Sequence, residues 1–79
     1  MKPKKRSLTL NGHKTSVSLE QPFWEFFCSI AQKEEKSLNV LASEIDASRD
    51  FGVGLATAIR LFCFNKAQKK NNPDLWTDV

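Results

Sequence analysis

The stretch KKRSLTLNGHKTSVSL, residues 4–19, decides the fold of this chain. Polar and apolar residues alternate on both sides of Asn11-Gly12, which is the two-residue period of a β-strand. An Asn-Gly pair between such runs favours a tight hairpin, because both residues tolerate the positive φ of a type I′ turn. A two-residue turn gives the ribbon one mainly apolar face and one face of short hydroxyls and a lysine. The apolar side holds Leu8, Leu10, His13, Thr15, Val17 and Leu19, and the opposite side holds Ser7, Thr9, Lys14, Ser16 and Ser18.

Three helical segments follow the ribbon. Pro22 suits the first turn of a helix that runs to about Lys33, because its fixed φ fits there and its missing N–H is not needed. Ser37 is a suitable N-cap for a second helix that ends near residue 47 or 48. A third helical pattern extends from Leu55 to roughly Lys69. The chain is therefore mainly helical, with an N-terminal β-ribbon.

The apolar residues of the first helix exceed the single stripe that a surface helix needs. A chain of 79 residues buries only about 60 to 65 per cent of the surface that its unfolded form exposes, so a monomer of this size is marginal. A second copy of the chain is the economical source of a covering surface. A ligand pocket is the less favoured interpretation, because aromatic residues at helical spacing are ordinarily core or interface. The residues concerned are Phe23, Trp24, Phe26, Phe27, Cys28, Ile30 and Ala31.

Positive charge is concentrated at the N-terminus. The net charge is +3, yet Lys2, Lys4, Lys5 and Arg6 supply four of the twelve Lys and Arg residues, and the remainder is 8 − 9 = −1. Residues 1–6 are therefore predicted to form a basic arm. Two interpretations stay open, an electrostatic contact with phosphate backbones and a tail that only promotes solubility.

Catalytic and metal-binding constellations are not evident. With one histidine, His13, and no tyrosine, no nucleophile and base can be paired, so no enzyme activity is expected. The widely separated His13, Cys28 and Cys63 do not have the spacing of a metal site, and no cofactor is predicted. Gly52-Val53-Gly54 lacks the lysine and third glycine of a phosphate loop. Reduced cysteines favour a cytoplasmic protein, with a Cys28–Cys63 disulfide as the open alternative, and no apolar run predicts a membrane span.

The order of these elements resembles that of the ribbon-helix-helix proteins of the MetJ/Arc superfamily. The residues that carry the likeness are the strand Lys14–Leu19, the helix from Gln21 to Lys33, and Ser37-Leu38 at the start of the next helix. The run from Lys5 to Glu20 with Phe23-Trp24, and the later Ala58-Ile59-Arg60-Leu61-Phe62, are similar to a bacterial subfamily of small ribbon-helix-helix proteins. The resemblance spans about residues 5–66.

This resemblance implies an intertwined homodimer whose antiparallel ribbon, one strand from each chain, enters the major groove of double-stranded DNA. Lys14, Ser16 and Ser18 would face the bases. Phosphate contacts would come from the basic arm and from the backbone at Ser37 and Leu38. The resemblance places the following residues in the dimer core: Val17, Leu19, Phe23, Trp24, Phe27, Ile30, Leu41 and Ile45. Whether Lys4–Leu10 pairs back as a hairpin or extends along the DNA backbone is left open.

The expected organisation is a basic arm (1–6), a ribbon-helix-helix domain with an additional C-terminal helix (7–66) and a polar tail (67–79). The expected function is a dimeric, DNA-binding transcriptional regulator. The alternative is a dimeric protein-interaction module, such as an antitoxin-like partner protein. In the tail, Leu75 and Trp76 are large apolar residues among polar ones, which predicts docking on the chain itself or on a protein partner.

Overall fold

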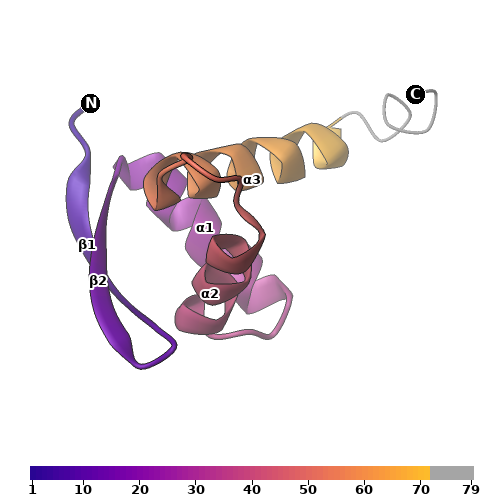
Figure 1. The fold of residues 1–79 in the computed structure, drawn as a ribbon. Coiled ribbons are helices and arrows are strands. Elements are labelled where there is room, and N and C mark those ends of the chain that lie inside the picture. The colour runs from indigo at the N-terminus through magenta and orange to yellow at the C-terminus, as the bar shows by residue number, and fades with distance from the viewer. Residues whose placement is uncertain (72–79) are drawn as a thin grey trace.

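A β-hairpin lies against three helices in the computed structural model, which describes residues 1–71 (Figure 1). In Figure 1 the hairpin stands to one side of the helices, and α3 extends away from it toward the C-terminus. The elements are β1 (Lys4–Leu10), β2 (His13–Leu19), α1 (Gln21–Lys33), α2 (Leu38–Ser48) and α3 (Leu55–Asn71). The expected ribbon, two helices and additional C-terminal helix are therefore confirmed.

The turn between the strands has the expected chemistry. Asn11 has a φ of 52° and Gly12 a φ of 81°, both in the region that a type I′ turn requires. The strands pair antiparallel, with Leu10 opposite His13 beside the turn and Lys4 opposite Leu19 at the far end. This register settles the question about Lys4–Leu10, which pairs back on its own chain. The hairpin in the structure is thus formed within one chain, and pairing of strands between two chains, which the resemblance implied, stays a prediction.

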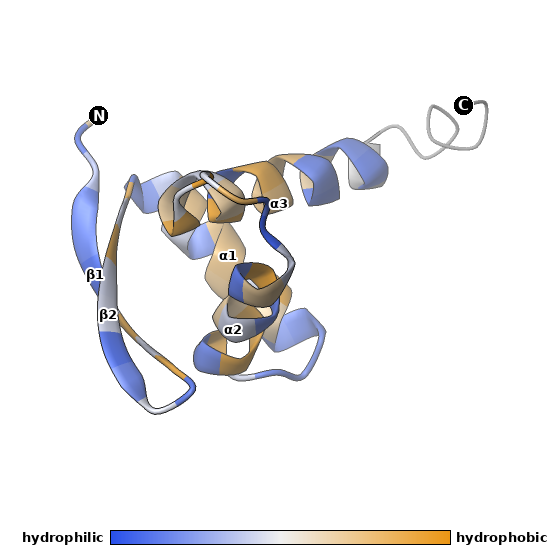
Figure 2. Ribbon diagram, viewed as in Figure 1, coloured by the Kyte–Doolittle hydropathy of each residue, from blue (hydrophilic) through white to orange (hydrophobic). Residues whose placement is uncertain are grey.

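The apolar face of the ribbon and the inner faces of the helices form one core. Figure 2 shows hydrophobic residues concentrated where the helices meet, and largely hydrophilic residues along β1. Of the eight residues expected in a dimer core, six are buried within the single chain, and Phe23 and Trp24 pack partly buried against them. Their burial therefore needs no partner. The buried residues are Leu8, Leu10, Val17, Leu19, Phe27, Ile30, Ala31, Leu41, Ala42, Ile45, Ala58, Ile59 and Cys63.

The connection between α1 and α2 is fixed by backbone geometry at both helix ends. Glu35 takes a left-handed φ of 57°, the N–H of Glu35 donates to Gln32 O (3.1 Å), and the N–H of Lys36 donates to Ala31 O (2.9 Å). These two bonds form a Schellman motif, with glutamate at the position that glycine usually occupies. The hydroxyl of Ser37 accepts a hydrogen bond from Val40 N at 3.1 Å, which confirms the predicted N-cap.

Two boundaries differ from those expected. Lys4, Lys5 and Arg6 belong to β1, so only residues 1–3 precede the first strand. At the other end, α3 continues to Asn71, so the first residues of the expected tail are helical. Leu75 and Trp76 lie outside the described residues.

Neither cysteine forms a disulfide; Cys63 is buried and Cys28 half-buried. Burial raises the pKa of the Cys63 thiol to about 11, which keeps it protonated at neutral pH. Among residues 1–71, no helix combines the length and apolar character needed to cross a membrane.

Candidate nucleic-acid interface

The face of the ribbon that points away from the helices is entirely polar. It carries Lys5, Ser7, Thr9, Lys14, Ser16 and Ser18, all exposed. The register sets them in three opposing pairs, Lys5 with Ser18, Ser7 with Ser16 and Thr9 with Lys14. We call these six residues the ribbon face. It presents hydroxyl groups in the middle, a lysine near each end and no carboxylate.

These side chains can form hydrogen bonds with the edges of base pairs. Hydroxyl groups donate and accept, and lysine donates to the O6 and N7 atoms of guanine. A two-stranded ribbon also fits the major groove, which is about 12 Å wide. Lys14, Ser16 and Ser18, the residues expected to face bases, all lie on this face and on the same strand.

The distribution of charge along the chain suits the ribbon face to an anionic partner. The first 19 residues contain five Lys and Arg residues and no Asp or Glu, a charge of +5. The other 60 residues contain seven Lys and Arg and nine Asp and Glu, so their charge is 7 − 9 = −2. The positive potential of the molecule is therefore centred on the ribbon and the residues before it.

Arg6, which was expected in the basic arm, lies in β1 on the face of the strand opposite to the ribbon face. Its side chain points toward the helices, where the guanidinium carbon lies 5.3 Å from the centre of the Trp24 ring. Its Nη2 atom donates to Gln21 Oε1 at 2.6 Å, and its Nε atom is buried without a hydrogen-bond partner. Arg6 therefore attaches β1 to α1. The sequence could have indicated this position, because side chains two residues apart in a strand share a face, and Arg6 therefore lies on the same face as Leu8 and Leu10.

The N-terminus of α2 lies beside the outer edge of β1. The Thr9 N–H donates to Asn39 Oδ1 at 2.9 Å. Ser37 caps Val40, while the N–H groups of Leu38 and Asn39 have no acceptor within the described residues. Unpaired N–H groups and the positive end of the helix dipole make such a terminus suitable for an anion. Leu38 offers only its backbone, because its side chain packs against the core.

Lys36 does not add a free cation to this terminus. Its Nζ atom lies 2.8 Å from Glu44 Oε1 and 3.5 Å from Glu34 Oε1. The hydrogen bond to Glu44, with the charge of Glu34, raises the pKa of Lys36. The lysine joins α2 to the preceding turn and is engaged in two ion pairs.

The outer edge of β2 is less covered than that of β1. In this register Lys14, Ser16 and Ser18 direct their backbone N–H and C=O groups away from β1, as Thr9 does on the other edge. The carbonyl of Ser18 accepts from Arg60 Nη2 at 3.1 Å. Within residues 1–71, the backbone groups of Lys14 and Ser16 on this edge have no partner. The edge is open beside the residues of the ribbon face.

Arg60 holds the end of β2 and the start of α1 together. Its Nε and Nη2 atoms lie 3.0 Å and 3.2 Å from the two carboxylate oxygens of Glu20. Hydrogen bonds from Arg60 hold the pKa of Glu20 below its usual value. Sequence patterns did not reveal this contact, because 40 residues separate its partners. The similarity of Ala58–Phe62 to the later helix of the subfamily was the one available signal.

A protein-family model described as "Ribbon-helix-helix domain" matches residues 3–67, which is 65 of the 79 residues. The chain belongs to the ribbon-helix-helix domain family. Proteins of this family commonly bind DNA as regulators, generally as dimers, and their domains are typically non-enzymatic. Comparisons with curated proteins and with solved structures found no match. The match includes β1 and most of α3, so the intrachain hairpin and the additional helix both lie within this ribbon-helix-helix domain.

Proposed function

We propose that this chain is a dimeric DNA-binding transcriptional regulator that turns its ribbon face toward DNA and reads the major groove with the β2 residues of that face. The observation that carries the proposal is the ribbon face itself, six exposed residues that are all hydroxyl-bearing or cationic. A face used only for solubility needs no such restriction to groups that bind base edges and phosphates.

The open edge of β2 is the proposed place of dimerisation. Antiparallel pairing about a twofold axis at Ser16 sets Lys14 of one chain opposite Ser18 of its partner. The result is a sheet of four strands, with the two β2 strands in its centre. Its outer strand axes are about 14 Å apart, which exceeds the groove width of about 12 Å. Only the central pair therefore reaches the bases, through Lys14, Ser16 and Ser18.

Phosphate contacts come from the flanks in this arrangement. Lys5 lies on β1 at the side of the groove, and Lys2 and Lys4 lie at or before the start of the same strand. The backbone N–H groups at the start of α2, after Ser37, provide a second contact beside the edge of β1. Arg6 is omitted from this set because Trp24 and Gln21 engage its guanidinium.

Specificity should be modest. Serine donates and accepts at several base edges, whereas bidentate Arg, Asn and Gln side chains discriminate more sharply. The hydroxyl-rich ribbon face therefore supplies weak base preference, and the phosphates supply much of the affinity. We expect a strong dependence of binding on salt concentration.

The test combines selection from random duplex DNA with light scattering on the same preparation. We expect a dimer that enriches a two-fold symmetric sequence, and the variant Lys14→Ala/Ser16→Ala should lose both affinity and preference. Lys33→Ala is the matched control for the lysine, because Lys33 is an exposed lysine of α1 and not of the ribbon. Unchanged affinity and preference in the double variant would show that the ribbon face does not read DNA.

A protein-interaction module is the second candidate, and exposed apolar side chains favour it. Leu61 and Phe64 on α3 are 53% and 55% exposed, and Phe51, in the loop before α3, is fully exposed. Such residues are frequent at protein interfaces. An antitoxin-like role predicts a protein partner that the intact chain captures and that a chain truncated after Lys70 does not. Retention of every partner by the truncated chain would count against a role of the tail.

A further inference from the structure

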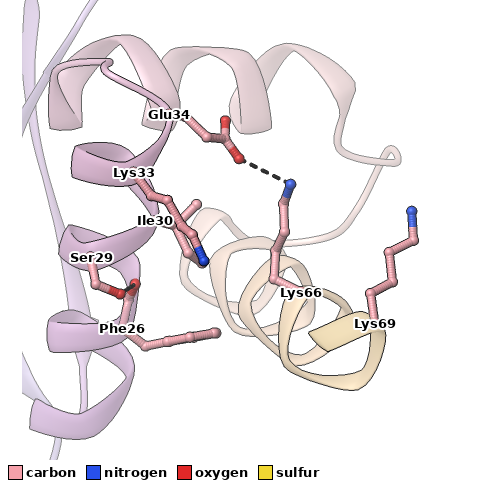
Figure 3. Close-up of a pocket in the computed structure, with 7 residues that line it drawn as sticks. All are labelled: Phe26, Ser29, Ile30, Lys33, Glu34, Lys66 and Lys69. Atoms are coloured by element: carbon pink, nitrogen blue, oxygen red, sulfur yellow. Dashed lines mark hydrogen bonds and ion pairs between the residues drawn. The ribbon is translucent and has the colours of Figure 1, made fainter. Parts of the chain in front are cut away.

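A groove of about 520 Å³ separates α1 from the C-terminal half of α3. Figure 3 shows Phe26 and Lys33 extending from α1 toward α3, and Lys66 reaching from α3 to Glu34. Phe26 and Ile30 give the groove an apolar floor, and Ile30 belongs to the core. The remaining residues that line it are polar or charged: Ser29, Lys33, Glu34, Lys66 and Lys69.

The rim of this groove is positively charged. Three lysines and one carboxylate line it, a net charge of +2. The carboxylate of Glu34 is already bound by Lys66 at 3.0 Å and by Lys36 at 3.5 Å. Lys33 is exposed and forms no ion pair with the described residues. An apolar floor under a cationic rim fits a short peptide with large apolar side chains between acidic ones.

We propose that the groove binds the C-terminal segment of the same chain, Asp74-Leu75-Trp76-Thr77-Asp78. Leu75 and Trp76 cover Phe26 and Ile30, while Asp74 and Asp78 approach the lysines of the rim. The segment has two large apolar residues and two acids and no base, so it complements the groove in both hydropathy and charge. The groove is consequently an intramolecular peptide site, independent of DNA binding.

The length of the chain allows this contact. Lys69 lines the groove two residues before α3 ends at Asn71, so the end of the helix lies close to the rim. Lys66 lies about 7.5 Å back along the helix axis, at 1.5 Å per residue. The five residues that follow Asn71, up to Trp76, span up to about 16 Å, enough to return to Lys66 and the floor. Pro73 favours a change of chain direction after the end of α3, because it lacks the N–H that would continue a helix.

The experiment is an isotope-filtered nuclear Overhauser measurement on the full chain. Trp76 and Trp24 are the two tryptophans, so the indole N–H signals are assigned with one Trp76→Phe sample. We expect contacts between the Trp76 indole and both the Phe26 ring and the Ile30 methyl groups, within one molecule. Contacts that appear only between differently labelled molecules would place the tail on a second copy and overturn the proposal, as would the absence of any contact.

A matched pair of variants tests the charge component. Lys33→Gln and Gln32→Glu each change the charge by −1 at adjacent exposed positions, but only Lys33 lines the groove. The indole shift of Trp76 reports the equilibrium between docked and undocked segment. We expect Lys33→Gln to reduce the docking equilibrium about two- to fivefold, the range for an exposed ion pair, and Gln32→Glu to leave it unchanged. Equal effects of the two variants would overturn the proposed ion pairing.

Discussion

Arg60 on α3 donates hydrogen bonds from two nitrogen atoms to the carboxylate of Glu20, which lies 40 residues earlier in the sequence. The same guanidinium also donates to the carbonyl of Ser18, the last residue of the ribbon face. The additional helix of this domain, α3, thus holds the end of β2 and the start of α1 in their relative orientation. The orientation of the proposed DNA-reading strand depends on a residue that lies far from it in sequence.

Replacing Arg60 should loosen the junction between ribbon and helices. Arg60→Gln removes the paired hydrogen bonds to Glu20, and we expect a Tm lower by a few degrees in thermal melts. Arg60→Lys should recover little of this loss, because an ammonium group cannot reproduce the two parallel bonds of a guanidinium. Asn65→Asp, at an exposed position of the same helix, changes the charge by the same amount and serves as the control for Arg60→Gln. Full recovery by lysine would show that charge alone matters at this position.

The Glu20 carboxylate should also make stability dependent on pH in the acid range. Hydrogen bonds from Arg60 lower the pKa of Glu20 from its usual 4.5, so the folded state favours the ionised form. Its contribution is present above pH 4.5 and is lost as pH falls through the lower, folded-state pKa. Melts between pH 7 and pH 3 should show a steeper loss in the native chain than in Glu20→Gln. In an Arg60→Gln background, Glu20→Gln should change the pH profile little, and an undiminished effect there would contradict the pairing.

The left-handed backbone at Glu35 offers a stabilising substitution. Glu35→Gly should raise the free energy of unfolding by about 1 kcal/mol, because glycine adopts a positive φ without the steric cost of a side chain. The matched control is Glu25→Gly, the same change at an exposed position inside α1, which should lower it by about 1 kcal/mol. Urea unfolding measures both. Destabilisation by both variants would contradict a left-handed conformation at residue 35.

Adjacent residues of α2 should differ sharply in their contribution to the core. Leu41 is 2% exposed and Val40 is 49% exposed. Leu41→Ala should cost about 2–5 kcal/mol, the range for a buried leucine, whereas Val40→Ala, at an exposed surface position, should change stability by no more than about 0.5 kcal/mol. Urea unfolding at two protein concentrations adds a second readout. If the loss for Leu41→Ala varied with concentration, this residue would pack in a dimer core and not within one chain.

Local patterns predicted the elements well because their causes are local. The Asn11-Gly12 turn, the alternation of Val17 and Ser18, and the cap at Ser37 each depend on neighbours within a few residues, and the structure confirms them. The Arg60–Glu20 contact depends on how α3 packs, which no periodicity records. The Asn-Gly turn favoured the intrachain hairpin that the structure contains, whereas the pairing of strands between chains that the family resemblance implied stays a prediction. That Lys14, Ser16 and Ser18 contact DNA bases stays a prediction.

Lys5 and Arg6 provide the sharpest test of the ribbon face, since they are adjacent cations on opposite sides of β1. Lys5 is exposed on the ribbon face, whereas Arg6 contacts Trp24 and Gln21. Lys5→Ala should reduce the slope of log affinity against log salt by about one unit, as expected for one lost phosphate contact, and leave the Tm unchanged. Arg6→Ala should lower the Tm and leave the slope unchanged where the protein remains folded. Titrations of duplex DNA at several salt concentrations, with a melt of each variant, measure both quantities. The reverse assignment, with Arg6 controlling the slope, would mean that β1 turns its other face to the DNA.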